Sequence, residues 1–138
     1  MNIPKTVSCF LAATSVSTSA YAVTLQYRCG PFTGHDYADQ GGWSTLTEQS
    51  HPKSIIFSFS NSSKGSYAII DQSGKPHIRE DVPVTRNSHA VRYMESANYY
   101  VWIHTIDLEA MTVHRVIQQI DSTPYRFTGL YSAPCEIR

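Results

Sequence analysis

Apolar and polar residues alternate along much of the chain after residue 24, the pattern of strands that bury one face. The clearest run covers residues 54–60, where Ile55, Phe57 and Phe59 fall on one face. We expect this face to belong to the core. The polar segment 61–65 that follows predicts a hairpin connection into a further strand at residues 66–70.

The second half of the chain carries longer runs of the same kind. Residues 98–107 and 112–119 predict the longest strand pair, and residues 125–131 predict a last strand that leads to Cys135. Pro83 interrupts one of the runs. Because proline cannot donate a ladder hydrogen bond, we expect an edge strand or a bend there.

The strand pattern as a whole predicts an all-β fold. About eight short strands, spaced about ten residues apart, are joined by connections too short for crossover helices. This arrangement is typical of an antiparallel meander that forms one small β-barrel or β-sandwich. Periodicity does not choose between the two, so both remain open.

The first 22 residues have the three parts of an export signal. Lys5 supplies a positive charge, residues 7–16 form a short apolar stretch, and Ala20 and Ala22 form a small-residue cleavage motif. We expect cleavage after Ala22 and a single β domain at residues 23–138. The apolar stretch is shorter than the roughly 20 residues that cross a bilayer. The signal therefore predicts a periplasmic or secreted protein without membrane insertion, from a bacterium of the Gram-negative type.

The chain has three cysteines, and Cys9 would leave with the signal. Cys29 and Cys135 then remain, one near each end of the domain, and an exported protein with one pair of cysteines should join them in a disulfide. Their wide spacing does not fit a redox or metal motif. The disulfide would place the first and last strands side by side.

The net charge and the motifs of the sequence limit which partners and which chemistry we expect. The chain has 11 basic and 11 acidic residues, and losing Lys5 leaves one excess negative charge. This balance gives no electrostatic footprint for nucleic acid or an anionic membrane. The sequence has no Gly-x-Ser-x-Gly nucleophile motif and no dense metal-ligand spacing among its six histidines. We therefore expect no cofactor, no bound metal and no catalysis.

His104 and His114 are the best candidates for a shared metal site, since they flank one predicted hairpin. They would face each other if Asp107 pairs with Met111, and would point to opposite faces if Asp107 pairs with Thr112. Ala110 does not suit the last position of a three-residue loop, which favours the second register. We then expect ordinary surface or rim histidines, and the metal-dependent hydrolase is the least favoured function.

Two groups of residues are candidates for binding. The glycine-rich segment 34–43 predicts a loop that presents aromatic anchors to a partner. The alternative is a simple surface loop whose Trp43 lies in the core. Tyr100 and Trp102 share one face of a strand, which predicts either an aromatic binding surface, a lined cavity or a second buried face. The candidate residues are His35, Asp36, Tyr37, Asp39, Trp43, Tyr100 and Trp102.

These features favour a small exported, non-enzymatic binding module. One form of it is an inhibitor or immunity-type protein that blocks another protein through the aromatic loop or a sheet face. The alternative is a lipocalin-like barrel that binds a small apolar ligand in a cavity of about 300 Å³ or more. The sequence does not specify the ligand, the partner or the oligomeric state.

Overall fold

The structure is a computed structural model that describes residues 24–38, 42–45, 52–60, 63–120 and 127–138. The regular elements of this part of the chain are all β-strands. No helix within these ranges is long and apolar enough to cross a membrane. The strands are β1 (Leu25–Cys29), β2 (Thr33–Ala38), β3 (Gly42–Thr45), β4 (Ser54–Phe59), β5 (Lys64–Ile70), β6 (Pro76–Arg86), β7 (Ala90–Ala97), β8 (Tyr100–Asp107), β9 (Thr112–Gln119) and β10 (Phe127–Ile137).

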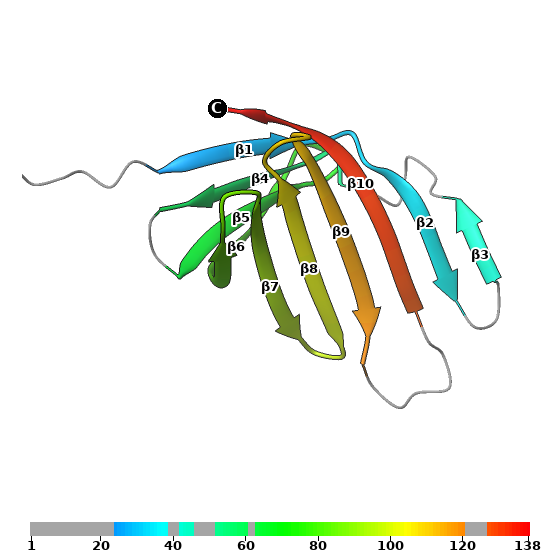
Figure 1. Ribbon diagram of the computed structural model, residues 1–138. Coiled ribbons are helices and arrows are strands. Elements are labelled where there is room, and N and C mark those ends of the chain that lie inside the picture. Colours follow the sequence, from blue (N-terminus) through cyan, green and yellow to red (C-terminus); the bar gives the residue numbers. More distant parts are fainter. Residues whose placement is uncertain (1–23, 39–41, 46–51, 61–62, 121–126) are drawn as a thin grey trace, which may run out of the picture.

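The strands form a closed antiparallel barrel (Figure 1). From β4 to β10 each strand pairs with the next along the chain, and β1 closes the barrel by pairing with both β4 and β10. Strand β2 pairs with the first part of β10 and β1 pairs with its last part, so the two strands together occupy one of the eight positions around the barrel. β3 is an extra strand on the outer edge of β2. The meander is confirmed, and the β1–β10 pairing makes the fold a barrel.

The predicted disulfide is present and joins the first and last strands. Cys29 pairs with Cys135 in the β1–β10 register and is bonded to it through sulfur. The bond thus fastens the barrel where its closure depends on the most distant parts of the chain.

Strand β6 bends as it passes around the barrel, as its proline predicts. Residues up to Pro83 pair with β5, whereas Val84 and the residues after it pair with β7. Asp81, just before the proline, has a positive φ of 56°. Between β6 and β7 the backbone ladder spans three residue pairs, so the two strands separate beyond Val84 and Tyr93.

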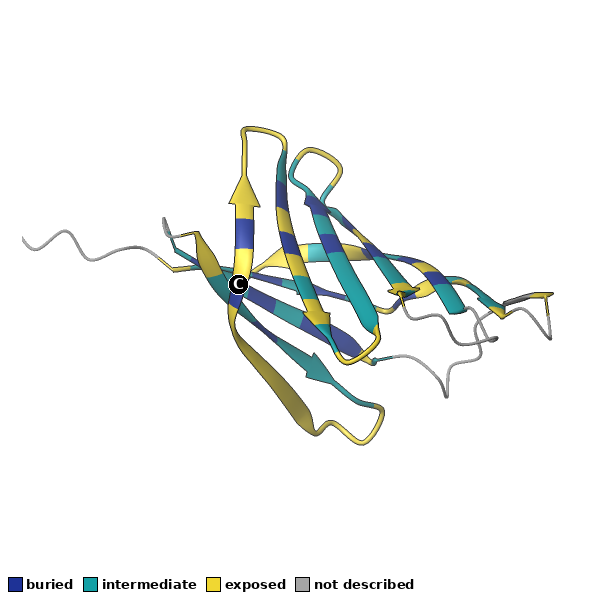
Figure 2. Cartoon of the chain, turned by 90° about the horizontal axis from the view of Figure 1, so that it is seen from below, coloured by how far each residue is buried: buried dark blue, intermediate teal, exposed yellow. Residues whose placement is uncertain are grey.

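Buried and exposed residues alternate along the strands, as the banding in Figure 2 shows. The alternating face of β4 is core, as predicted, with Ile55 and Phe57 fully buried and Phe59 2% exposed. The inner faces of β7, β8 and β9 add a row of fully buried apolar side chains. This row consists of Val91, Ile106 and Val113, which are paired across the ladder. We call this part of the barrel the closed end.

Strands β4 and β5 pack over part of the sheet made by β7–β10. Phe57 on β4 lies 5.0 Å from Tyr93, and Tyr67 on β5 lies 4.9 Å from His104, both measured between ring centroids. The lower parts of β8–β10 and β2 continue past this contact in Figure 1. Strands β4 and β5 therefore cover only part of the inner face of this sheet, and we call the part beyond them the mouth of the barrel.

Candidate functional site

A hollow of about 690 Å³ lies at this mouth, between the inner face of β2, β9 and β10 and the turn after β5. Its volume is in the range of small-molecule sites. The side chains with apolar surface that line it are Pro52, Ile69, Ile117, Phe127 and Tyr131. Its polar lining residues are Asp36, Asp71, Gln72, Ser73 and Arg115.

A row of polar and aromatic side chains separates the mouth from the closed end. Tyr93, His104, Arg115 and Tyr131 stand opposite one another on the four neighbouring strands β7 to β10. All four are buried, with Arg115 and Tyr131 facing the hollow. The inner face thus changes from apolar to polar within two residues along each strand.

His104 is fully buried in the middle of this row. Its ring contacts Phe57 and Tyr67, and neither ring nitrogen has a hydrogen-bond partner. Burial, assisted by the charge of Arg115, lowers the pKa of His104 to about 3, so the ring is neutral at ordinary pH. The prediction of a surface or rim histidine is wrong here, because His104 has the same inward phase as Ile106.

The predicted register of the β8–β9 hairpin is confirmed. Asp107 pairs with Thr112, so His104 stands opposite Arg115 and His114 opposite Thr105. His104 points inward and His114 is exposed. The two imidazoles therefore cannot share one metal ion. Within the described ranges, no group of three or more His, Cys, Asp or Glu side chains could hold a metal ion.

Asp36 and Tyr131 are joined inside the mouth. The Tyr131 hydroxyl donates a hydrogen bond to Asp36 Oδ1, and burial, followed by this carboxylate, raises the pKa of Tyr131. Gly129 makes the contact possible. It pairs with Asp36 in the β2–β10 ladder, and a Cβ at this position would lie 2.1 Å from the Tyr131 hydroxyl oxygen.

Arg115 is 8% exposed, and its charged end lies in the mouth beside the Tyr131 ring, with 5.7 Å from Cζ to the ring centroid. Its Nε atom is buried without a hydrogen-bond partner. Among the described residues, no carboxylate forms an ion pair with its guanidinium. Burial lowers the pKa of Arg115, but a guanidinium remains charged in proteins.

Glu95 bridges the separated strands β6 and β7 on another side of the barrel. It accepts a hydrogen bond from the Tyr67 hydroxyl, and its other oxygen lies 3.5 Å from Arg79 Nε. The carboxylate is 18% exposed. This acid therefore has two partners.

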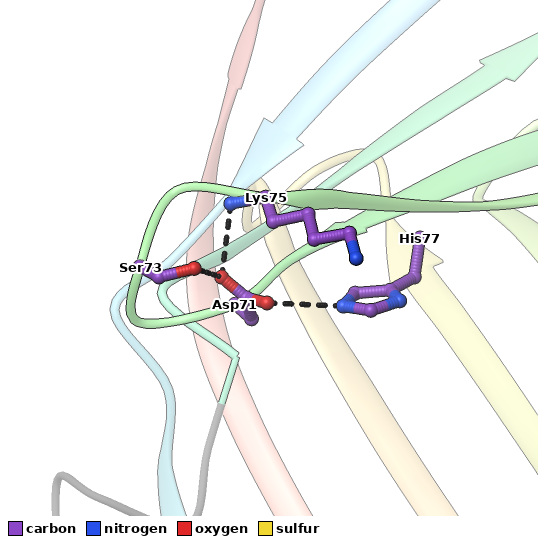
Figure 3. Close-up of polar contacts among 4 residues, drawn as sticks. All are labelled: Asp71, Ser73, Lys75 and His77. Atoms are coloured by element: carbon purple, nitrogen blue, oxygen red, sulfur yellow. Dashed lines mark hydrogen bonds and ion pairs between the residues drawn. The ribbon is translucent and has the colours of Figure 1, made fainter.

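The rim of the mouth is a turn built around Asp71 (Figure 3). Its carboxylate accepts hydrogen bonds from Ser73 Oγ at 2.6 Å and from the Lys75 backbone N–H at 2.9 Å, and lies 3.0 Å from His77 Nε2. These contacts, led by Ser73, lower the pKa of Asp71. The rim carboxylate is thus occupied by groups of its own turn.

Another hollow, of about 480 Å³, lies outside the barrel beside the disulfide. Arg28, Lys53 and Glu136 line it, and Lys53 and Glu136 are exposed. Water can solvate the exposed Lys53 and Glu136, whereas the side chain of Arg115 is buried. The mouth is therefore the stronger candidate site.

The predicted binding residues divide between the two faces of the sheet. The expected loop is in fact strand β2, with Asp36 facing the mouth and His35 and Tyr37 on the opposite face. Pairing with β10 holds this glycine-containing segment extended. Asp39 and the side chain of Trp43 lie outside the described residues, as do the cleavage residues Ala20 and Ala22 and the rest of the predicted signal.

Tyr100 and Trp102 lie on the inner face of β8, in phase with His104. Tyr100 packs against Trp102 at 5.7 Å and against Phe127 at 6.4 Å between ring centroids. Because Phe127 lines the mouth, this aromatic cluster extends its apolar wall. Tyr100 and Trp102 therefore lie inside the barrel beside the mouth and do not line the hollow themselves.

Sequence reasoning missed Arg115, Tyr131, Ile117 and Phe127. A usable signal was present in strand β9, where Arg115 has the same period-two phase as Val113 and Ile117. A charged residue in the inward phase of an apolar strand indicates either a buried ion pair or a binding site.

The fold and the site define the chain as an eight-stranded antiparallel barrel with one apolar end and one mouth lined by aromatic and charged groups. No protein-family model, curated protein or solved structure matches it. The function must therefore be inferred from the geometry of the mouth.

Proposed function

We propose that the protein is a non-enzymatic binding protein whose barrel mouth takes up a small amphipathic ligand. The observation that carries this proposal is the hollow of about 690 Å³ in which apolar side chains surround a few fixed polar groups. Such a combination is typical of small-molecule sites, where apolar walls supply affinity and polar groups fix orientation.

The aromatic wall supports the same function. Ile117 and Phe127 lie in the mouth, and the Tyr100–Trp102 pair extends the wall beyond it. The closed end is tightly packed and offers no comparable space among the described residues. The disulfide supports work in an oxidising compartment, as in the periplasm or outside the cell.

A protein partner is the second candidate. Tyr99 and Ile120 are 61% and 56% exposed, and the Ile120 backbone N–H donates to the Tyr99 carbonyl at 2.8 Å. Large apolar side chains gathered on a surface mark contact sites. Replacing both by serine should then remove a partner recovered by pulldown while leaving ligand uptake unchanged.

The proposed function is tested by calorimetric titration of the purified protein with 1-octanol. Wild type should bind, and Ile117→Asn should weaken binding about ten-fold, since it places an amide in the apolar wall. Ile78→Asn is the matched control, because Ile78 is 61% exposed on β6. Absence of binding to wild type, or equal weakening by both variants, would contradict the proposal.

A further inference from the structure

Arg115 is the one charged side chain of the described lining without a hydrogen bond or ion pair to another described residue, although the Tyr131 ring and the charge of Asp36 act on it. The Asp36 carboxylate accepts the Tyr131 hydroxyl, and the Asp71 carboxylate is held by its own turn. Arg115, by contrast, has a buried Nε without a partner and no ion pair among the described residues.

A buried charge without a partner destabilises a folded protein, because the charge loses its hydration and gains nothing in return. A protein that keeps such a group at the wall of a hollow can recover the loss when a ligand of opposite charge binds. The guanidinium also has donors arranged in a fork, which matches the two oxygens of a carboxylate.

We propose that the mouth binds a ligand with a single carboxylate head group, which pairs with the Arg115 guanidinium while its apolar body lies against Ile117 and Phe127. This inference rests on the proposed function and adds the chemical class of the ligand.

The other charges of the mouth restrict the head group to one negative charge. Asp36 and Asp71 both line the hollow, so the doubly charged head group of a phosphate monoester would meet two carboxylates for one guanidinium. A cationic ligand would have to compete with the donors that already hold these carboxylates. An uncharged ligand would leave the guanidinium unpaired.

The experiment compares three ligands with the same chain, namely octanoate, 1-octanol and octylammonium, by calorimetry at about pH 7, where the acid and the amine are ionised. Wild type should bind octanoate about ten-fold more tightly than 1-octanol, the value of one charge-assisted hydrogen bond. Arg115→Met should remove this preference, so that this variant binds octanoate no more tightly than 1-octanol. Arg92→Met, on the outer face of β7, should leave both affinities unchanged.

Each outcome has a distinct meaning. Equal binding of octanoate and 1-octanol by wild type, or tightest binding of octylammonium, would overturn the inference while the proposed function stands. Absence of binding by all three ligands would remove the proposed function and the inference together. If Arg115→Met does not fold, Arg115→Lys and Arg115→Gln replace it. Lysine should keep the octanoate preference and glutamine should lose it, and the reverse result would contradict the inference.

Discussion

The closed end and the mouth of the barrel lie on the same strands but differ in the side chains of their inner faces. Those of the closed end are apolar, whereas those near the mouth include polar groups without hydrogen-bond partners. At the closed end, Val91, Ile106 and Val113 are fully buried and apolar. One step along the strands, the inner face carries His104 and Arg115, whose ring and guanidinium nitrogens include buried atoms without partners. The buried apolar row therefore stabilises the fold, whereas the unpartnered nitrogens of His104 and Arg115 lower its stability.

This difference indicates that the apolar closed end stabilises the fold and that the unpartnered charge of Arg115 at the mouth lowers its stability. Proteins commonly keep strained or unpaired groups where they bind ligands, and their stability then comes from elsewhere. Changes at the closed end should lower the free energy of unfolding, whereas apolar replacement of a charge at the mouth should raise it.

The largest effect is expected from the disulfide that closes the barrel between β1 and β10. Replacing Cys29 and Cys135 together by serine should lower the free energy of unfolding by about 4 to 5 kcal/mol, because the bond closes a loop of 106 residues in the unfolded chain. Urea denaturation of both proteins measures the difference. Octanol binding by the fraction that stays folded should be unchanged. Equal urea midpoints would show that barrel closure does not depend on the bond.

The boundary between the two regions should respond to pH through His104. Its folded pKa of about 3 is below the usual value of 6.5, so the unfolded chain binds the proton more readily. Its contribution to stability is therefore complete above pH 6.5 and is lost as the pH falls towards 3, by up to about 1.4 kcal/mol per pH unit.

The charged and titratable groups that face His104 are Tyr93 on β7, Arg115 on β9 and Tyr67 on β5, with Phe57 on β4 completing its surroundings. His104→Phe keeps the ring packing and removes the titration. Urea midpoints measured between about pH 4 and pH 7 should fall less steeply for this variant than for wild type. Parallel slopes would show that His104 takes up its proton equally well in the folded state.

The sharpest test of the comparison is Arg115→Met without ligand. This change should raise the free energy of unfolding by about 1 to 2 kcal/mol, since methionine fills the space of the stem and removes an unpaired buried charge. Arg92→Met on the outer face should change it by less than about 0.5 kcal/mol. Thermal denaturation of the three proteins checks the order. A loss of stability in Arg115→Met would mean that the guanidinium supports the fold.

The sequence predicted features that depend on local pattern. Ile55, Phe57 and Phe59 are core because they place three large apolar side chains on one face, whereas the other face has Ile56 among serines. Strand β6 changes its partner at Pro83, where proline lacks a donor. The β8–β9 register followed from loop chemistry around Ala110. These outcomes require no knowledge of distant neighbours.

Features that depend on distant neighbours could not be predicted in this way. The choice of barrel over sandwich depends on the β1–β10 pairing, and the extended form of β2 depends on its partner β10. In strand β9, Arg115 shares the phase of Val113 and Ile117, but Val116 is apolar in the other phase, so only the pairing with β8 and β10 decides that Arg115 points inward. The mouth itself exists because β4 and β5 cover only part of the facing sheet.

The smallest expected effect concerns the link between Tyr131 and Asp36. Gly129→Ala would place a methyl group 2.1 Å from the Tyr131 hydroxyl oxygen and 2.5 Å from its Cζ atom, so the ring must move away from Asp36. We expect a loss of about 1 kcal/mol in the free energy of unfolding. In a Tyr131→Leu background the same substitution should have almost no effect, because leucine cannot reach residue 129 as the ring does. A double-mutant cycle by urea denaturation measures this coupling. An equal loss in both backgrounds would show that Gly129 is needed by the strand and not by the mouth.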